Sequence, residues 1–194
     1  MTSDTIEEGV ELAIKGGATI VQLREKQCSG REFFEVARSV KEVTDAYEIP
    51  LIINDRVDIA LAVDADGVHL GQKDIPATVA REIMGRHKII GVSANSEALA
   101  LQAQKDGADY IGIGDVFGTS TKENTSHVSL EQLKIIRERI KIPMVAIGGI
   151  HAGNAGQLKG TGIDGIAVIS AVLGAKNITA AAEELVGLLE DIRR

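Results

Sequence analysis

Short apolar runs rich in β-branched residues recur along the chain, and each is followed by a polar or glycine-rich turn and then by an amphipathic segment. This alternation predicts strands joined by helices, the pattern of parallel βαβ units. Strands are expected at residues 18–23, 51–53, 67–70, 88–92, 110–114, 144–147 and 165–169. Helices are expected at residues 3–15, 31–47, 56–63, 97–106, 130–139 and 180–193. The fold class is therefore α/β with a parallel sheet.

Four short segments of similar composition lie at residues 16–19, 64–67, 107–110 and 162–165. In each of them a predicted helix ends and a predicted strand begins, so the segments mark a βα repeat and not a binding site. We expect the acids Asp58, Asp64 and Asp66 to be solvated groups of a helix or a turn.

Seven strands are predicted, and a helix precedes the first of them. A closed (β/α)₈ barrel needs eight strands, so the fold is either an open doubly wound sheet or a barrel without its opening strand. Informative polar residues at nearly every strand end favour the second interpretation. We therefore predict a TIM (β/α)₈-type barrel with the first β-strand missing from this chain. Such a barrel exposes two strand edges and is expected to be strained, swapped or a homo-oligomer.

Length and composition narrow the range of protein classes to which this chain can belong. The 194 residues predict a single domain spanning residues 1–194, 44% of them hydrophobic, without an apolar run long enough for a membrane span. The amino terminus lacks the features of a secretory signal, and the one cysteine, Cys28, is typical of a reducing compartment. A cytoplasmic protein without a membrane partner is expected.

The net charge of −7 and the scarcity of aromatic residues (3%) argue against a nucleic-acid partner. An anionic small molecule stays compatible with this charge, because a few converging cations and backbone N–H groups can dominate a cleft.

Barrels place functional side chains at the carboxyl ends of their strands. Alternation along the first predicted strand sends Gln22, Arg24 and Lys26 to one side, where they would suit a heterocycle joined to a diphosphate. The alternative is a solvated strand end in which Arg24 pairs with Glu25.

Three further polar residues follow the next two strands. Asn54 and Asp55 end one strand and Asp74 follows the other, and one or two carboxylates are the usual protein ligands of Mg²⁺ beside substrate phosphates. A helix-capping role for Asn54 or Asp55 is the alternative. His69 lies within a strand and is as compatible with the core or a pocket wall as with catalysis.

The remaining strand ends carry hydroxyl groups and glycines. Ser93 alone is a weak signal, but Thr119, Thr121 and Lys122 lie in a long polar loop that could wrap an anion. A plain surface loop is the alternative, and the misplaced glycines of this segment exclude a Rossmann site. After the last two strands, Gly149 and the pair Ile169 and Ser170 could offer amides to a phosphate, unless Ser170 only caps a helix.

Seven motifs now stand in order along nearly the whole chain: Gln-x-Arg-x-Lys at 22–26, Asn-Asp at 54–55, Gly-Val-His-Leu-Gly-Gln-x-Asp at 67–74, Gly-Val-Ser at 91–93, Thr-x-Thr-Lys at 119–122, Ile-Gly-Gly-Ile at 147–150 and Ile-Ser at 169–170. With them the chain resembles the thiamine phosphate synthase family. The resemblance implies a Mg²⁺-dependent transferase that joins 4-amino-2-methyl-5-(diphosphooxymethyl)pyrimidine to a thiazole phosphate. The products would be thiamine phosphate and pyrophosphate, formed by a dissociative mechanism.

The resemblance also implies roles for individual residues. Asp55 and Asp74 would hold Mg²⁺ against the diphosphate. The leaving pyrophosphate would be bound by Arg24, Lys26, Asn54, Ser93 and Lys122, of which Arg24, Lys26, Ser93 and Lys122 are the expected catalytic residues. The pyrimidine would lie near Gln22 and Arg24. The thiazole phosphate would contact Thr119, Thr121 and the amides near Gly149, Ile169 and Ser170.

Two departures from the family pattern leave alternatives open. The family has proline where this chain has Asp115 and Gly118, and its first strand precedes the opening helix. A thiazole tautomerase-like paralogue is the rival within the fold, although the complete diphosphate-and-metal set favours the synthase. A phosphate-binding fragment of the fold without catalysis is the rival outside the enzyme class.

Overall fold

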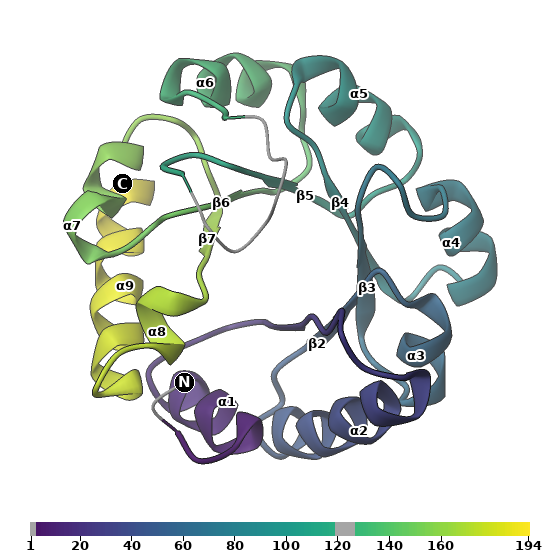
Figure 1. The fold of residues 1–194 in the computed structure, drawn as a ribbon. Helices are drawn as coiled ribbons and strands as arrows, with labels where there is room; N and C mark the ends of the chain where they lie inside the picture. Colours follow the sequence, from purple (N-terminus) through teal and green to yellow (C-terminus); the bar gives the residue numbers. More distant parts are fainter. Residues whose placement is uncertain (1–2, 119–126) are drawn as a thin grey trace.

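A parallel sheet curls inside a ring of helices in the computed structural model, which describes residues 3–118 and 127–194 (Figure 1). Its strands pair in chain order, each parallel to the next. They are β1 (Val21–Leu23), β2 (Leu51–Asn54), β3 (Gly67–Leu70), β4 (Ile89–Ser93), β5 (Tyr110–Ile113), β6 (Met144–Ile147) and β7 (Gly165–Ala167). The predicted α/β class and all seven predicted strands are confirmed.

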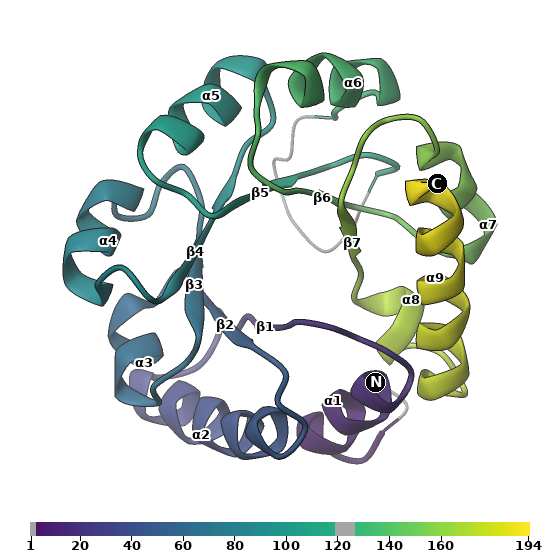
Figure 2. The ribbon, with the colours of Figure 1, turned by 180° about the vertical axis from the view of Figure 1, so that it is seen from behind.

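Helices cover the outer face of this sheet, as the views from both sides show (Figures 1 and 2). They are α1 (Ile6–Lys15), α2 (Gly30–Ala46), α3 (Val57–Ala62), α4 (Ala77–Met84), α5 (Glu97–Lys105), α6 (Leu130–Arg139), α7 (Ala152–Ala155), the 3₁₀ turn η1 (Gly156–Leu158), α8 (Ser170–Leu173) and α9 (Ile178–Arg193). Among the described residues, no helix is both long and apolar enough to cross a bilayer.

The sequence pattern did not predict α4, α7 or α8. Helix α4 begins after Pro76 without a side-chain cap, so its start carries no capping signal, and two of the three residues that it buries, Ala77, Ala80 and Met84, are small. The edge strands β1 and β7 are three residues each, shorter than predicted. Within the described chain each pairs on one side only, which leaves fewer ladder hydrogen bonds to extend it.

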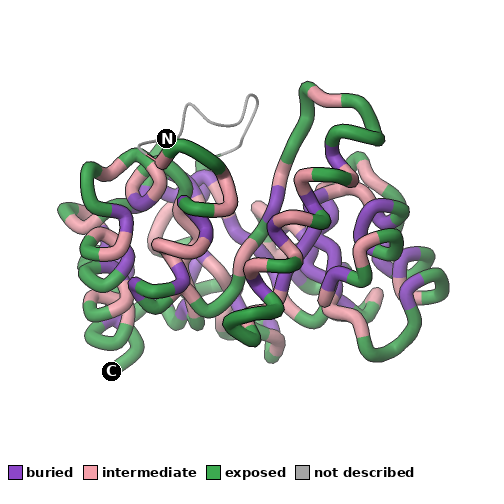
Figure 3. The backbone as a smooth tube through the Cα atoms, turned by 90° about the horizontal axis from the view of Figure 1, so that it is seen from below, coloured by how far each residue is buried: buried purple, intermediate pink, exposed green. Residues whose placement is uncertain are grey.

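The two faces of the sheet bury different side chains. Residues that face the helices, such as Ile53, Val68 and Ile111, are fully buried in one apolar cluster. The inner face carries Gly67, Gly91 and Gly112, where a Cβ would collide with neighbouring strands or rings. Buried positions accordingly follow the strands and the inward sides of the helices in Figure 3. Glycines thus leave room inside the curled sheet for larger side chains.

The helix ring closes where the first and last helices meet. Helix α1 packs against α9, and the Thr179 hydroxyl donates a hydrogen bond to Leu12 O at 3.0 Å. At Gly16, after α1, a Cβ would overlap Thr179 O and the Ala182 side chain. Glycine is therefore required for the close approach of these two helices.

Three aspartates lock neighbouring strands together at their amino ends. Asp66, Asp109 and Asp164 each donate their backbone N–H to a carbonyl and accept, through Oδ2, the N–H of the same residue on the preceding strand. The distances are 2.7–2.9 Å, and the bonded residues are Leu51, Ile90 and Met144. We call these reciprocal pairs the acid clamps.

A cation from the helix layer reaches each clamp: Lys41 lies 3.8 Å from Asp66 Oδ2, and Arg81 and Arg137 lie 2.6 and 2.9 Å from Asp109 Oδ2 and Asp164 Oδ2. The clamps give a structural explanation for three of the four repeated segments, those at residues 64–67, 107–110 and 162–165. The expectation that Asp66 is merely solvated was wrong, because its carboxylate satisfies the first N–H of β2.

Replacing Asp109 by alanine should lower the free energy of unfolding by about 1–2 kcal/mol, since Ile90 N–H at the start of buried β4 loses its acceptor. Urea denaturation measures the change. Asp106→Ala is the matched control, because its carboxylate accepts only an exposed Gln102 amide hydrogen bond on the same helix, and it should cost less than about 0.5 kcal/mol. Equal losses in the two variants would contradict the clamp.

Candidate functional site

The carboxyl ends of the strands bring a lysine and two carboxylates together. Lys26, after β1, places Nζ 3.3 Å from Asp55 Oδ2 after β2. Asp55 adopts the left-handed backbone conformation (φ +66°), and its N–H donates to His69 O at 2.9 Å, which anchors it to β3. Arg56 holds the N-cap position of α3 and no side chain caps this helix, so the helix-capping alternative for Asn54 and Asp55 was wrong.

Asp74 completes the acidic pair. Its Oδ2 accepts the Gly71 N–H at 2.6 Å, which fixes the turn after β3. Burial raises the pKa of Asp74 above its usual range; the Gly71 N–H opposes this shift, whereas the nearby Asp55 carboxylate adds to it. Two adjacent carboxylates form the donor set that a hard cation prefers. The described residues contain no larger His, Cys, Asp and Glu group that could hold a metal ion.

Arg24, the first residue after β1, keeps a donor available. Its Nε is buried and has no hydrogen-bond partner among the described residues. The alternative in which Arg24 pairs with Glu25 is not what the structure shows, because Glu25 Oε1 accepts the backbone N–H groups of Lys26 and Gln27. A buried unsatisfied guanidinium nitrogen suits an anionic ligand.

Ser93 lies at the end of β4, within a polar group inside the sheet. Its Oγ is 2.9 Å from His69 Nε2, and its carbonyl accepts the Gln72 Nε2–H at 2.7 Å. His69 Nδ1 is 2.9 Å from the Tyr110 hydroxyl. Burial raises the pKa of Tyr110, and the nearby Gln22 side chain opposes that rise.

Sequence reasoning missed Tyr110 and Gln72 and left His69 open. His69 is buried inside the sheet (1% exposed), as the pocket-wall interpretation expected. A signal for Tyr110 existed, because alternation along β5 puts it on the same face as Gly112. Asn54 is also buried, and the strand register sets it beside His69.

The carboxyl ends of β6 and β7 lie next to each other. Register pairs Ile147 with Ala167, and Gly149 and Ile169 each follow two residues later along the chain. Gly149 has φ +63°, and a Cβ there would overlap Gly118 O, so the segment after β5 passes directly over it. Ser170 is the first residue of α8 and Ile169 holds the cap position, so the alternative in which Ser170 caps this helix was wrong.

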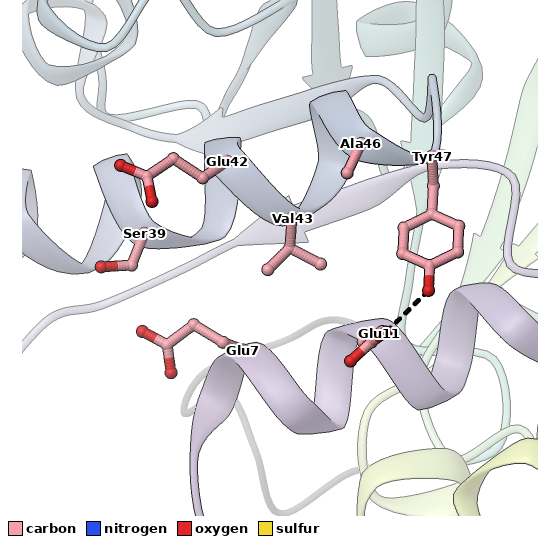
Figure 4. A pocket seen from close by; sticks show the side chains of 7 residues that line it. All are labelled: Glu7, Glu11, Ser39, Glu42, Val43, Ala46 and Tyr47. Carbon is pink, nitrogen blue, oxygen red and sulfur yellow. Dashed lines mark hydrogen bonds between the residues drawn. The ribbon is translucent and has the colours of Figure 1, made fainter.

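A separate hollow of about 440 Å³ lies between α1 and α2, away from the strand ends (Figure 4). The Tyr47 hydroxyl donates to Glu11 Oε1 at 2.6 Å across it, and this bond, with Lys15, holds the pKa of Glu11 below its usual range. Its lining residues are Glu7, Glu11, Ser39, Glu42, Val43, Ala46 and Tyr47. The Glu11 carboxylate therefore stabilises a contact between the two helices.

A family model described as thiamine monophosphate synthase matches residues 1–172. The chain belongs to this family. The resemblance inferred from the seven sequence motifs is thereby confirmed.

Relatives within the family are close. Thiamine-phosphate synthase of Ruminiclostridium cellulolyticum is 60% identical over 186 residues, which are 95% of this chain and 88% of the relative. The enzyme of the same name from Clostridium tetani is 56% identical over 94% of this chain and 87% of its own length.

A solved structure, thiamine phosphate pyrophosphorylase from Pyrococcus furiosus, superposes with a TM-score of 0.89 at 46% identity and covers 97% of this chain and 91% of its own. 3-Hexulose-6-phosphate synthase, at 19% identity and a TM-score of 0.68, covers 94% of each chain and shares the fold alone.

Three of the residues that the family resemblance implicated, Thr119, Thr121 and Lys122, lie outside the described residues. The structure brings Lys26, Asp55 and Asp74 together at neighbouring strand ends. Gly149, Ile169 and Ser170 lie at the adjacent ends of β6 and β7.

Asp74→Asn should raise the free energy of unfolding of the metal-free protein at pH 7. The pKa of Asp74 is raised in the folded state, so its ionised form lowers stability at neutral pH, and this cost disappears as the pH falls through the raised pKa. The gain of the variant should therefore shrink at acidic pH. Urea titrations in a chelator at several pH values measure it.

Asp58→Asn is the control of opposite sign. The Arg56 guanidinium lowers the pKa of Asp58, so that variant should lose stability at neutral pH and none at pH values below the lowered pKa. A destabilised Asp74→Asn protein at pH 7 would contradict the assignment of a strained acidic pair.

Proposed function

We propose that this protein is a transferase that condenses 4-amino-2-methyl-5-(diphosphooxymethyl)pyrimidine with a thiazole phosphate, giving thiamine phosphate and pyrophosphate. The observation that carries the proposal is the cluster of Lys26, Asp55 and Asp74 at adjoining strand ends in a chain of this family. A cation beside two carboxylates is suited to a diphosphate bridged by a metal ion.

The mechanism proposed is dissociative. Pyrophosphate leaves first, and the amino group of the pyrimidine stabilises the resulting methyl cation, which the thiazole nitrogen then attacks. Arg24, Lys26 and Ser93 would donate to the departing oxygens, aided by Asn54 and by Lys122, which lies outside the described residues. Such donors lower the barrier because the charge they face grows as the bond breaks.

Asp55 and Asp74 would hold Mg²⁺, and their proximity supports this role since two ionised carboxylates need a counter-charge. When bound, the ion would neutralise charge on the diphosphate. Gln22 would lie against the pyrimidine, since its side chain meets the inner-face Tyr110.

The thiazole phosphate would occupy the neighbouring ends of β6 and β7. Gly149 lacks a Cβ, so a ligand oxygen can approach its backbone, and the amides near Ile169 and Ser170 begin the next helix. Thr119 and Thr121 would add hydroxyl donors. Separating the two phosphates in this way keeps the nucleophile in line with the departing group.

The curled sheet supports a (β/α)₈ barrel that lacks its first strand. Edges β1 and β7 frame the place of one further strand, and Ile20 and Ile169 beside them are 51% and 53% exposed. Open edges also support the proposal of a homo-oligomer. A cytoplasmic location agrees with the single cysteine and with the biosynthetic activity proposed.

Asp55→Ala should lower the rate of thiamine phosphate formation by about 10²–10³-fold, as expected when charge stabilisation of the leaving group is lost. Lys122→Ala should have an effect of similar size. Asp58→Ala is the matched control, since this nearby acid pairs with Arg56, and it should keep the rate within about twofold. Unchanged rates in both Asp55→Ala and Lys122→Ala would refute the diphosphate site. A wild-type chain that binds the thiazole phosphate without turnover would establish the non-catalytic alternative.

Mg²⁺ should stabilise the protein through the same two carboxylates. At a concentration about 100 times its Kd, the ion should add about 2.7 kcal/mol to the free energy of unfolding. Asp55→Ala and Asp74→Asn should abolish the gain, and Asp58→Ala should retain it. Denaturation with and without EDTA measures the difference; an identical gain in all three variants would place the ion elsewhere.

A further inference from the structure

Three polar side chains from β3, β4 and β5 form a continuous hydrogen-bonded series inside the sheet, and Gln22 from β1 lies near its Tyr110 end. The Tyr110 hydroxyl lies 2.9 Å from His69 Nδ1, and His69 Nε2 lies 2.9 Å from Ser93 Oγ. His69 is 1% exposed, so bulk water has little access to its ring. The series ends at Ser93, the strand-end hydroxyl of the proposed diphosphate site.

The backbone is shaped to hold the two rings. Register sets Gly91 between His69 on β3 and Tyr110 on β5, and a Cβ at Gly91 would overlap the Tyr110 ring. A Cβ at Gly112 would lie 2.9 Å from His69 Cε1. Close packing on both sides fixes the rings and therefore the order of the hydrogen bonds.

The chemistry of the groups sets the direction of donation. A phenolic O–H is a stronger hydrogen-bond donor than an imidazole N–H, and an unprotonated imidazole nitrogen is a stronger acceptor than a phenolic oxygen. The Tyr110 O–H is then directed to His69 Nδ1, which must be unprotonated to accept it. A neutral imidazole carries its one proton on the other nitrogen, so His69 Nε2–H donates to Ser93 Oγ.

We infer that Tyr110 is a positioning residue that holds His69 in the Nε2-protonated tautomer and so frees the Ser93 hydroxyl hydrogen for an anionic oxygen. In the other tautomer, Ser93 would donate to His69 and would present only lone pairs to the ligand. The Gln72 bond to the Ser93 carbonyl keeps the backbone of Ser93 in place. Donation of the Ser93 hydroxyl hydrogen to a diphosphate oxygen rests on the proposed function. The tautomer of His69 does not depend on that function.

Nitrogen-15 NMR of the histidine rings tests the tautomer without turnover. The chain has four histidines, and the His69 signals are those absent from His69→Gln. The wild-type protein should show Nε2 protonated and Nδ1 as an acceptor, and Tyr110→Phe should shift His69 toward the other tautomer. A wild-type His69 protonated on Nδ1, or an unchanged spectrum in Tyr110→Phe, would overturn the inference.

A double-mutant cycle tests the link to Ser93, with inorganic pyrophosphate and Mg²⁺ as the binding probe. Tyr110→Phe should weaken pyrophosphate binding about fivefold, the factor of about one hydrogen bond, when Ser93 is present. In Ser93→Ala the same change should have an effect below about 1.5-fold, because the hydroxyl it orients is gone. Additive losses would show that Tyr110 acts independently of Ser93.

Tyr47→Phe is the matched control, since the chain has two tyrosines and Tyr47 bonds Glu11 on the outer helices. It should change neither the His69 spectrum nor pyrophosphate affinity. If pyrophosphate binds as expected but thiamine phosphate is not formed, the proposed function fails and the tautomer inference stands.

Discussion

The acid clamps set the strand register on which the candidate site depends. Asp66, Asp109 and Asp164 tie the amino ends of β2 to β3, β4 to β5 and β6 to β7 through reciprocal backbone bonds. Because parallel strands advance together, fixing one edge also fixes the heights at which the strands end at the other. A shift of one residue would turn His69 and Ser93 from the inner face of the sheet to the outer face.

The sequence predicted the features that depend on the local order of residues. It did not predict the side-chain contacts that depend on how the strands pair. Strand positions and the group of Lys26, Asp55 and Asp74 were accessible because period-two patterning and the carboxyl-end rule place them without knowledge of contacts. The partnership of Tyr110 with His69 requires the pairing of β3 through Gly91 to β5, which no single segment encodes.

Helix α4 and the clamp role of Asp66 were missed for a related reason. Helix α4 begins without a capping side chain, and an acid in a turn looks the same in sequence whether it faces solvent or a strand terminus. The chemical type of a side chain was therefore easier to infer from the sequence than the group to which it is hydrogen-bonded.

The contact between α1 and α9 has a consequence for biosynthesis. Gly16 and Leu12 meet Thr179 and Ala182, so the first and last helices hold each other in place across almost the entire chain. During translation the ring cannot close until α9 has emerged from the ribosome. Until then α1 lacks its partner surface, and the nascent chain exposes apolar groups that chaperones recognise.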